Sequence, residues 1–210
     1  MKIMKKDNMP YISGGKEIFT DSAYSFELTE YPWGNPNGYD GKVYVHIGYS
    51  DRGIHVGFTV YESKAPRAKQ TQNNSAVCTD SCVEFFFRPD SKKELPYINI
   101  EMNSLGTMLL KHSFGRHETY PIDRSDESIF EKYASGWDGE KWRVSYCIPY
   151  SVITSCFPDI KPLASGSVIS CNFYKCGDHT EKPHYITRYP IMTEKPDYHR
   201  PEYFREVTLL

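Results

Sequence analysis

Carboxylate, amide and phenol side chains recur at every second position in three segments of this 210-residue chain. In residues 81–88, 97–103 and 166–176 they alternate with apolar side chains, which is typical of strands with one face in a core. Together they offer hydrogen-bond donors and acceptors that suit a neutral polar ligand such as a sugar. The alternative is an ordinary solvated sheet face. The polar members of this pattern are Glu84, Asn99, Glu101, Asn103, Asn172 and Tyr174.

Charged and aromatic residues elsewhere in the chain could complete such a ligand site. We expect Arg116, Lys175 and His184 at its edge, where a guanidinium could donate two parallel hydrogen bonds to vicinal hydroxyls or to a uronate carboxylate. Aromatic rings can cover the C–H faces of a pyranose. Trp33, in a loop rich in Gly, Asn and Pro, and Tyr189 are the candidates for stacking.

A hydrolase is the second hypothesis. Glu84 and Glu101 could form the acid/base pair of a glycosidase if neighbouring antiparallel strands place them at a suitable separation. Against this, a flat sheet face would give little desolvation to raise the pKa of one carboxyl. The sequence also lacks a GxSxG nucleophile elbow and a glycine-rich phosphate loop. Binding without catalysis is therefore the leading hypothesis.

Residues 177–201 contain the other possible hydrolytic centre, a metal site built from Asp178, His184 and His199. Imidazole and carboxylate ligands suit Zn, Fe or Ni. These residues lack the tight HxH or HExxH spacing of metal sites, so a hydrogen-bonded structural role for the histidines is favoured. A third hypothesis is that the polar side chains form an internal hydrogen-bond network that fixes the loops.

Cysteine usage indicates a reducing compartment. None of the six cysteines forms a CxxC pair, and six in 210 residues are too few for a disulfide framework. We expect buried free thiols. Residues 1–10 contain no apolar leader segment, which predicts a cytoplasmic protein, and a secretion signal that has been removed is the alternative. The cysteines are Cys78, Cys82, Cys147, Cys156, Cys171 and Cys176.

Alternating segments recur along the chain and predict the elements that must position these residues. Residues 43–49 and 54–60 flank a turn with Asp51 and Gly53, which predicts a hairpin. About ten short strands with almost no helix predict an all-β fold, a two-sheet antiparallel β-sandwich or jelly roll. Further strands are expected at 81–88, 97–103, 107–112, 142–148, 166–176 and 205–209, with a short helix near 150–157.

Composition and charge exclude several classes of protein. Abundant Tyr (17), Gly (14) and Pro (14) favour strands and turns, so a helical bundle or coiled coil is excluded. The net charge is −2 and the sequence has no basic stripe, so we expect no nucleic-acid partner. No run approaches 18 apolar residues, so we expect no membrane partner. No linker or repeat divides the chain, which predicts one domain over residues 1–210 with a flexible tail at 1–15.

Six segments, in order, together resemble bacterial proteins related to family 9 carbohydrate-binding modules. Their order and spacing cover roughly residues 40–210, and as a set they are characteristic of that family. The segments are TDSCVEFF (79–86), YINIEMN (97–103) with Gly106-Thr107, WRVSYCIP (142–149), NFYKCGD (172–178), PHY (183–185) and PDYHRPEYF (196–204).

The resemblance implies a β-sandwich with a ligand face and carbohydrate binding without catalysis. Members of that family hold a sugar between two Trp rings and carry structural calcium, so the resemblance suggests a carbohydrate partner and calcium as a cofactor. This sequence departs from the pattern at one ring, because Arg188-Tyr189 stand where related sequences have Trp after the Pro-His-Tyr segment. No calcium loop of the family matches it residue by residue.

Overall fold

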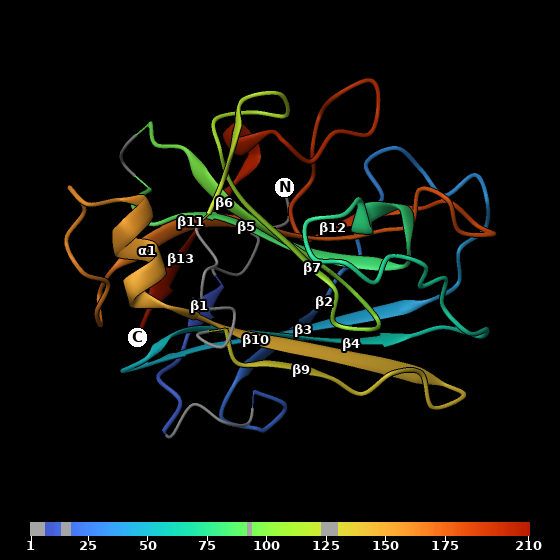
Figure 1. The fold of residues 1–210 in the computed structure, drawn as a ribbon, viewed down its shortest axis with the longest axis horizontal. Helices are drawn as coiled ribbons and strands as arrows, with labels where there is room; N and C mark the ends of the chain where they lie inside the picture. Colours follow the sequence, from blue (N-terminus) through green and yellow to red (C-terminus); the bar gives the residue numbers. More distant parts are fainter. Residues whose placement is uncertain (1–6, 14–17, 92–93, 123–129) are drawn as a thin grey trace, which may run out of the picture.

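The computed structural model describes residues 7–13, 18–91, 94–122 and 130–210. Two sheets lie face to face, and helix α1 (Tyr150–Cys156) packs at one end of them (Figure 1). This confirms the predicted β-sandwich. The strands are β1 (Asn8–Met9), β2 (Tyr24–Glu27), β3 (Lys42–Ser50), β4 (Gly53–Tyr61), β5 (Cys82–Arg88), β6 (Tyr97–Asn103), β7 (Met108–Ser113), β8 (Thr119–Pro121), β9 (Lys132–Ala134), β10 (Lys141–Pro149), β11 (Val168–Cys176), β12 (Tyr185–Thr187) and β13 (Arg205–Leu209).

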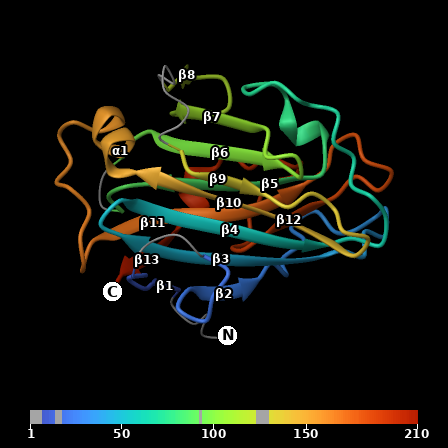
Figure 2. The same cartoon turned by 60° about the horizontal axis from the view of Figure 1, so that its bottom comes forward.

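The larger sheet has the strand order β1-β13-β11-β5-β6-β7-β8, and β12 pairs with β11. The smaller sheet has the order β2-β3-β4-β10-β9, and it lies in front of the larger sheet in Figure 2. The pairings between these strands are all antiparallel except that of β1 with β13. The long central strands β5, β6 and β11 therefore meet side by side, although β11 is distant from the other two in the sequence.

Period-two alternation decides which side chains enter the core between the sheets. Val83, Phe85 and Phe87 of β5 belong to that core, and Cys171 and Phe173 of β11 pack with them. Burying a large apolar side chain contributes about 1.5–3 kcal/mol, so this row fixes which face of each strand points inward. The intervening polar residues are directed to the outer face of the larger sheet.

The outer face of the larger sheet carries a second apolar cluster and is covered by loops. Phe86, Tyr97 and Tyr174 project from the strands, and Ile191 and Tyr198 pack onto them from the loop that follows β12. The 3-10 turns Val77–Thr79 and Pro201–Tyr203 belong to the covering segments. This face is therefore not the open, solvated surface that one of the sequence interpretations assumed.

The expected flexible tail differs from the structure at residues 7–13. β1 pairs with β13, and the buried Asp7 carboxylate accepts hydrogen bonds from Arg188, Tyr24 and Tyr189. A buried carboxylate with three donors ties this segment to the sandwich. Residues 1–6 and 14–15 of the expected tail lie outside the described residues. No helix in the described part of the chain has the length and apolar character that a bilayer span requires.

Candidate functional site

Two glutamates face each other on the outer side of β5 and β6. Glu84 and Glu101 are directly opposed in the strand register, and their exposed fractions are only 3% and 6%. Asn99 donates a hydrogen bond to Glu101 (3.2 Å), and the Cys176 thiol donates one to Glu84 (3.0 Å). Two carboxyls are thus held side by side beneath the loops.

Burial changes the acidity of both carboxyls. Desolvation, with repulsion from the charge of Glu101, raises the pKa of Glu84 well above its usual value. Desolvation also raises the pKa of Glu101 to about 7, although the hydrogen bond from Asn99 opposes the shift. The expectation that this face would give little desolvation was wrong, because the loops exclude water from it.

These carboxyls lie at the base of a small pocket of about 130 Å³, which we call the acidic pocket. Arg116 and Asp197 form an ion pair at its rim (Nη2 to Oδ1, 2.8 Å), and both are partly exposed. Its charged and aromatic lining residues are Glu84, Glu101, Arg116, Asp178, Tyr185, Asp197, Tyr198 and His199. Of the ten residues expected to bind the ligand, three line this pocket: Glu84, Glu101 and Arg116.

Aromatic rings form one side of the acidic pocket. Tyr185 and Tyr198 line it, and the Trp33 ring lies 6.0 and 5.9 Å from their ring centroids. The Trp33 indole N–H donates to the backbone oxygen of Thr193 (2.9 Å). Trp33 therefore supports the two tyrosines from behind, instead of presenting its own ring to the pocket.

Asn103 and Asn172 use their amides to hold loops. Asn103 donates to Asp80 and accepts from the backbone N–H groups of Leu105 and Thr107. Asn172 donates to the backbone oxygen of Tyr189 and accepts from the backbone N–H of the same residue. Both amides are fully buried. For these two residues the structure matches the hypothesis of an internal hydrogen-bond network.

The two remaining tyrosine candidates are also interior residues. Tyr174 is fully buried, and its ring stacks on Tyr198 with centroids 4.2 Å apart. Tyr189 is 3% exposed and donates to Asp7 (2.7 Å), so it is not the exposed stacking ring that we expected. The reason is the N-terminal segment, whose Asp7 draws the Tyr189 hydroxyl inward.

Lys175 and His184 belong to a separate buried network between the two sheets. Lys175 follows Tyr174 and therefore points to the inner side, where Nζ lies 3.7 Å from Glu62 and donates to His184 Nε2 (2.6 Å). Glu62 also accepts from Tyr39 and Trp142. Desolvation and the nearby Lys175 lower the pKa of His184 to about 2, so this imidazole is neutral. We call this group the Lys175 network.

The Lys175 network borders a wider opening of about 490 Å³, which we call the charged groove. Its rim is formed by exposed ion pairs, Lys64 with Glu181 (2.8 Å) and Lys182 with Asp40 (3.3 Å). These four side chains therefore pair with one another across the rim, as Arg116 and Asp197 do at the acidic pocket.

The expected histidine metal site is not assembled. Asp178 and His199 line the acidic pocket, but His184 is stacked on Tyr39 in the Lys175 network. His199 instead shares a hydrogen bond with the Tyr97 hydroxyl (2.7 Å). Burial, with the nearby Arg116 charge, lowers the pKa of His199 to about 4.

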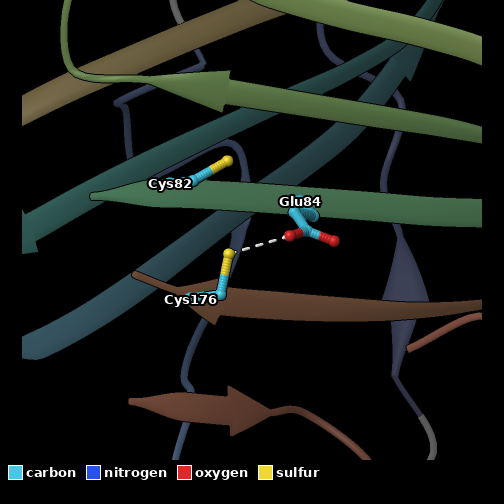
Figure 3. Close-up of side chains that lie close together, drawn as sticks. All are labelled: Cys82, Glu84 and Cys176. Atoms are coloured by element: carbon cyan, nitrogen blue, oxygen red, sulfur yellow. Dashed lines mark hydrogen bonds between the residues drawn. The ribbon is translucent and has the colours of Figure 1, made fainter. Parts of the chain in front are cut away.

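One cluster of three potential metal ligands occurs among the described residues. It consists of Cys82, Glu84 and Cys176, all buried, with their ligand atoms within 4.8 Å of one another (Figure 3). Calcium takes six to eight oxygen ligands, and two of these three donor atoms are sulfur, so the cluster does not fit the calcium that the resemblance suggested.

Several residues of the acidic pocket were missed at the level of sequence. Asp197 and Tyr198 lie in a segment that carried the family resemblance, but nothing in their spacing marked them as pocket residues. Cys82 had a readable signal, because it stands two positions before Glu84 and so shares its face. Cys176 likewise shares the face of Tyr174.

Comparisons with known proteins agree with this fold. Residues 21–209 match the sequence model of carbohydrate-binding family 9. No curated protein matches the chain significantly. A putative carbohydrate-binding protein from Bacteroides uniformis has a TM-score of 0.82 at 24% identity, covering 97% of this chain and 98% of that one.

Two further similar structures are of a family 9 carbohydrate-binding module from Caldicellulosiruptor kristjanssonii. The complex with cellotriose has a TM-score of 0.64 at 15% identity and covers 98% of this chain and 93% of that one. The complex with glucose has a TM-score of 0.62 at 14% identity, with coverage of 98% and 96%. At these identities the structural likeness shows the fold.

Proposed function

Because the chain belongs to carbohydrate-binding family 9, we propose that it binds a sugar without cleaving it and that the acidic pocket is the binding site. One observation supports this choice of site: Glu84, Glu101 and the Arg116 guanidinium converge on one small concavity. Polar groups that converge in a concave site are the usual basis of small-ligand recognition.

The chemistry of the lining suits hydroxyl groups. With its pKa near 7, Glu101 is partly protonated at neutral pH, so its carboxyl can donate a hydrogen bond as well as accept one. At the rim Arg116 donates two hydrogen bonds to Asp197 and keeps a further N–H donor group, Nη1, for a ligand, and Asp178 supplies a carboxylate acceptor. A sugar hydroxyl can use both kinds of partner at once.

The aromatic side chains and the small volume of the pocket narrow the range of possible ligands. Tyr185 and Tyr198 provide ring surface against which the C–H groups of a pyranose can pack. A pocket of about 130 Å³ is small, so we propose a free monosaccharide or the terminal unit of a chain. The related module from C. kristjanssonii was solved with cellotriose and with glucose, which makes glucose-based sugars the first ligands to test.

The position of the glutamates favours binding over hydrolysis. A glycosidase places its acid and its base or nucleophile on opposite sides of the scissile bond. Here Glu84 and Glu101 are cross-strand neighbours that approach the pocket from the same side. Side-by-side carboxyls can hydrogen-bond one sugar unit together, but they do not flank a glycosidic bond.

Isothermal titration of glucose, cellotriose and a uronic acid into the chain tests this proposal. We expect saturable binding that Arg116→Ala weakens about 10- to 100-fold, as the loss of charge-assisted hydrogen bonds predicts. The matched control is Lys182→Gln, which removes an exposed cation from the charged groove and should leave affinity unchanged. If binding does not saturate at roughly 10 mM sugar, the affinity is weaker than the about −4 kcal/mol of a millimolar Kd, and this would contradict sugar binding. If Lys182→Gln lowers the affinity and Arg116→Ala does not, the site lies in the charged groove.

A further inference from the structure

Two cysteines and a glutamate meet on the outer face of the larger sheet, at the junction of β5 and β11. Cys82 is directly opposite Cys176 in the strand register, and Glu84 lies two residues along β5 on the same face. Figure 3 shows the Cys176 thiol directed at the Glu84 carboxyl, with Cys82 on the same strand as Glu84. Strand pairing, and not a flexible loop, therefore sets their separation.

The spacing of the donor atoms matches a small, tetrahedrally coordinated ion. With zinc–sulfur bonds of about 2.3 Å, tetrahedral ligands lie about 3.8 Å apart. The Cys176 Sγ to Glu84 Oε1 distance is 3.0 Å, and all three ligand atoms lie within 4.8 Å of one another. Side-chain adjustments of about an ångström would bring all three to bonding distance of one centre.

The donor set selects the class of metal. Two thiolates favour borderline or soft ions, and the added carboxylate fits Zn²⁺ and its spectroscopic substitutes Co²⁺ and Cd²⁺. All three groups are buried, and a buried thiolate or carboxylate without a positive partner is unfavourable in free energy. A divalent cation would supply that positive charge. We propose that Cys82, Glu84 and Cys176 bind a zinc-class divalent ion, with its remaining coordination position directed toward the acidic pocket.

Access to this site is through the acidic pocket. Glu84 and Cys176 line the pocket, whereas Cys82 lies beneath it and is fully buried. An ion that enters the pocket meets Glu84 and Cys176 first, and water or a pocket ligand can complete its coordination. Zinc sites with three protein ligands and one open position have this form.

The acidity of the ligands makes binding depend on pH. Desolvation raises the pKa of Cys82 to about 11, and the hydrogen bond with the Cys82 thiol, together with burial, raises that of Cys176. Both thiols are therefore protonated near neutral pH when no cation is present. Metal binding must displace those protons, so affinity should increase as pH rises.

None of the other described cysteines belongs to a cluster of three ligand residues, and this includes Cys78, although it lines the acidic pocket. Cys171 packs in the core on the opposite face of β11, and Cys156 is a partly exposed residue of α1. Cys147 lies 3.7 Å from His55 without belonging to a cluster of three ligands among the described residues. Cys156 therefore serves as the matched control thiol.

Titration of the reduced, full-length chain with Co²⁺ or Cd²⁺ tests the proposal. We expect one ion per chain and a thiolate-to-metal charge-transfer band, with Zn²⁺ displacing the probe ion. Cys82→Ser and Cys176→Ser should each lower affinity at least ~100-fold, because losing a direct ligand should exceed the 10- to 100-fold effect of losing a ligand's hydrogen-bond partner. Glu84→Gln should weaken binding but retain the thiolate band, and Cys156→Ser should change neither.

Two results would overturn the proposal: no thiolate band in the reduced chain, or a band that persists in the Cys82→Ser/Cys176→Ser double variant. Circular dichroism of each variant separates loss of a ligand from loss of the fold, and Cys82→Ala offers a second, smaller substitution. The sugar test uses Arg116, outside this cluster, so either proposal can fail while the other stands.

Discussion

The acidic pocket and the Lys175 network both contain buried ionisable groups, but they hold them in opposite ways. In the Lys175 network, Lys175 and Glu62 have opposite charges, and Glu62 also accepts from Tyr39, Ser81 and Trp142. In the acidic pocket, two carboxyl groups, Glu84 and Glu101, oppose each other directly without a cation between them, and burial raises the pKa of both. The first arrangement is internally satisfied and braces two sheets, whereas the second retains unused capacity that a ligand can meet.

The largest expected effect comes from breaking the satisfied arrangement with Glu62→Gln. The amide keeps the shape of the side chain but leaves the Lys175 ammonium, which is fully buried, without its counter-charge. Breaking one partner of a buried pair costs about 3–5 kcal/mol, so we expect a loss of that size in the free energy of unfolding, measured by urea denaturation. For a chain of this length that corresponds to a decrease in Tm of about 10 °C.

Lys175→Met is the companion variant, because it removes the other charge and retains the length of the stem. If Glu62→Gln costs less than about 1 kcal/mol, the two regions do not differ in the way we describe. The double variant Glu62→Gln/Lys175→Met should recover part of the loss, since no unpaired charge remains buried.

The second expected effect sharpens the comparison from the side of the acidic pocket. The pKa of Glu101 in the folded chain, about 7, is above its ordinary value of 4.5. The folded state therefore binds a proton that the unfolded state has released between these values, so this group makes stability fall as pH rises from about 4.5 to 7. At pH 8 Glu101→Gln should stabilise the chain by about 1–3 kcal/mol, since one pKa unit corresponds to 1.36 kcal/mol.

The measurement is the difference in unfolding free energy between Glu101→Gln and the unsubstituted chain across pH 4–8. A difference is needed because His184 and His199, whose pKa values are lowered, change stability in the opposite direction as pH rises toward 6.5. A difference that does not vary with pH would show that Glu101 is not held protonated by burial.

The sandwich itself could be predicted because its signal is local. Alternation separated Val83, Phe85 and Phe87 from Glu84, and the structure places the first three in the core and Glu84 on the outer face. A strand shows its faces through neighbouring residues alone, so no knowledge of distant segments was required.

The composition of the site could be predicted only in part, because its loops and strand neighbours are distant in the sequence. Asn103 and Asn172 have amides that could bind a ligand, but these amides form hydrogen bonds with the loops that fold over the sheet. Tyr189 turns inward because Asp7, 182 residues away, accepts its hydroxyl. The meeting of Cys82 with Cys176 depends on β11 pairing with β5, which alternation within either strand does not reveal.

The smallest expected effect comes from the rim of the charged groove. Lys64 and Glu181 form an ion pair in which both side chains are 71% exposed, and solvent screening reduces the value of such a pair. We expect Lys64→Gln to leave Tm and sugar affinity unchanged within error, measured by thermal unfolding and by titration. A clear loss of sugar affinity in this variant would show that the charged groove also has binding capacity, and the contrast between a satisfied region and a receptive one would then fail. An unchanged affinity, beside a loss in Arg116→Ala, would restrict recognition to the outer face of the larger sheet, where the two carboxyl groups are buried together.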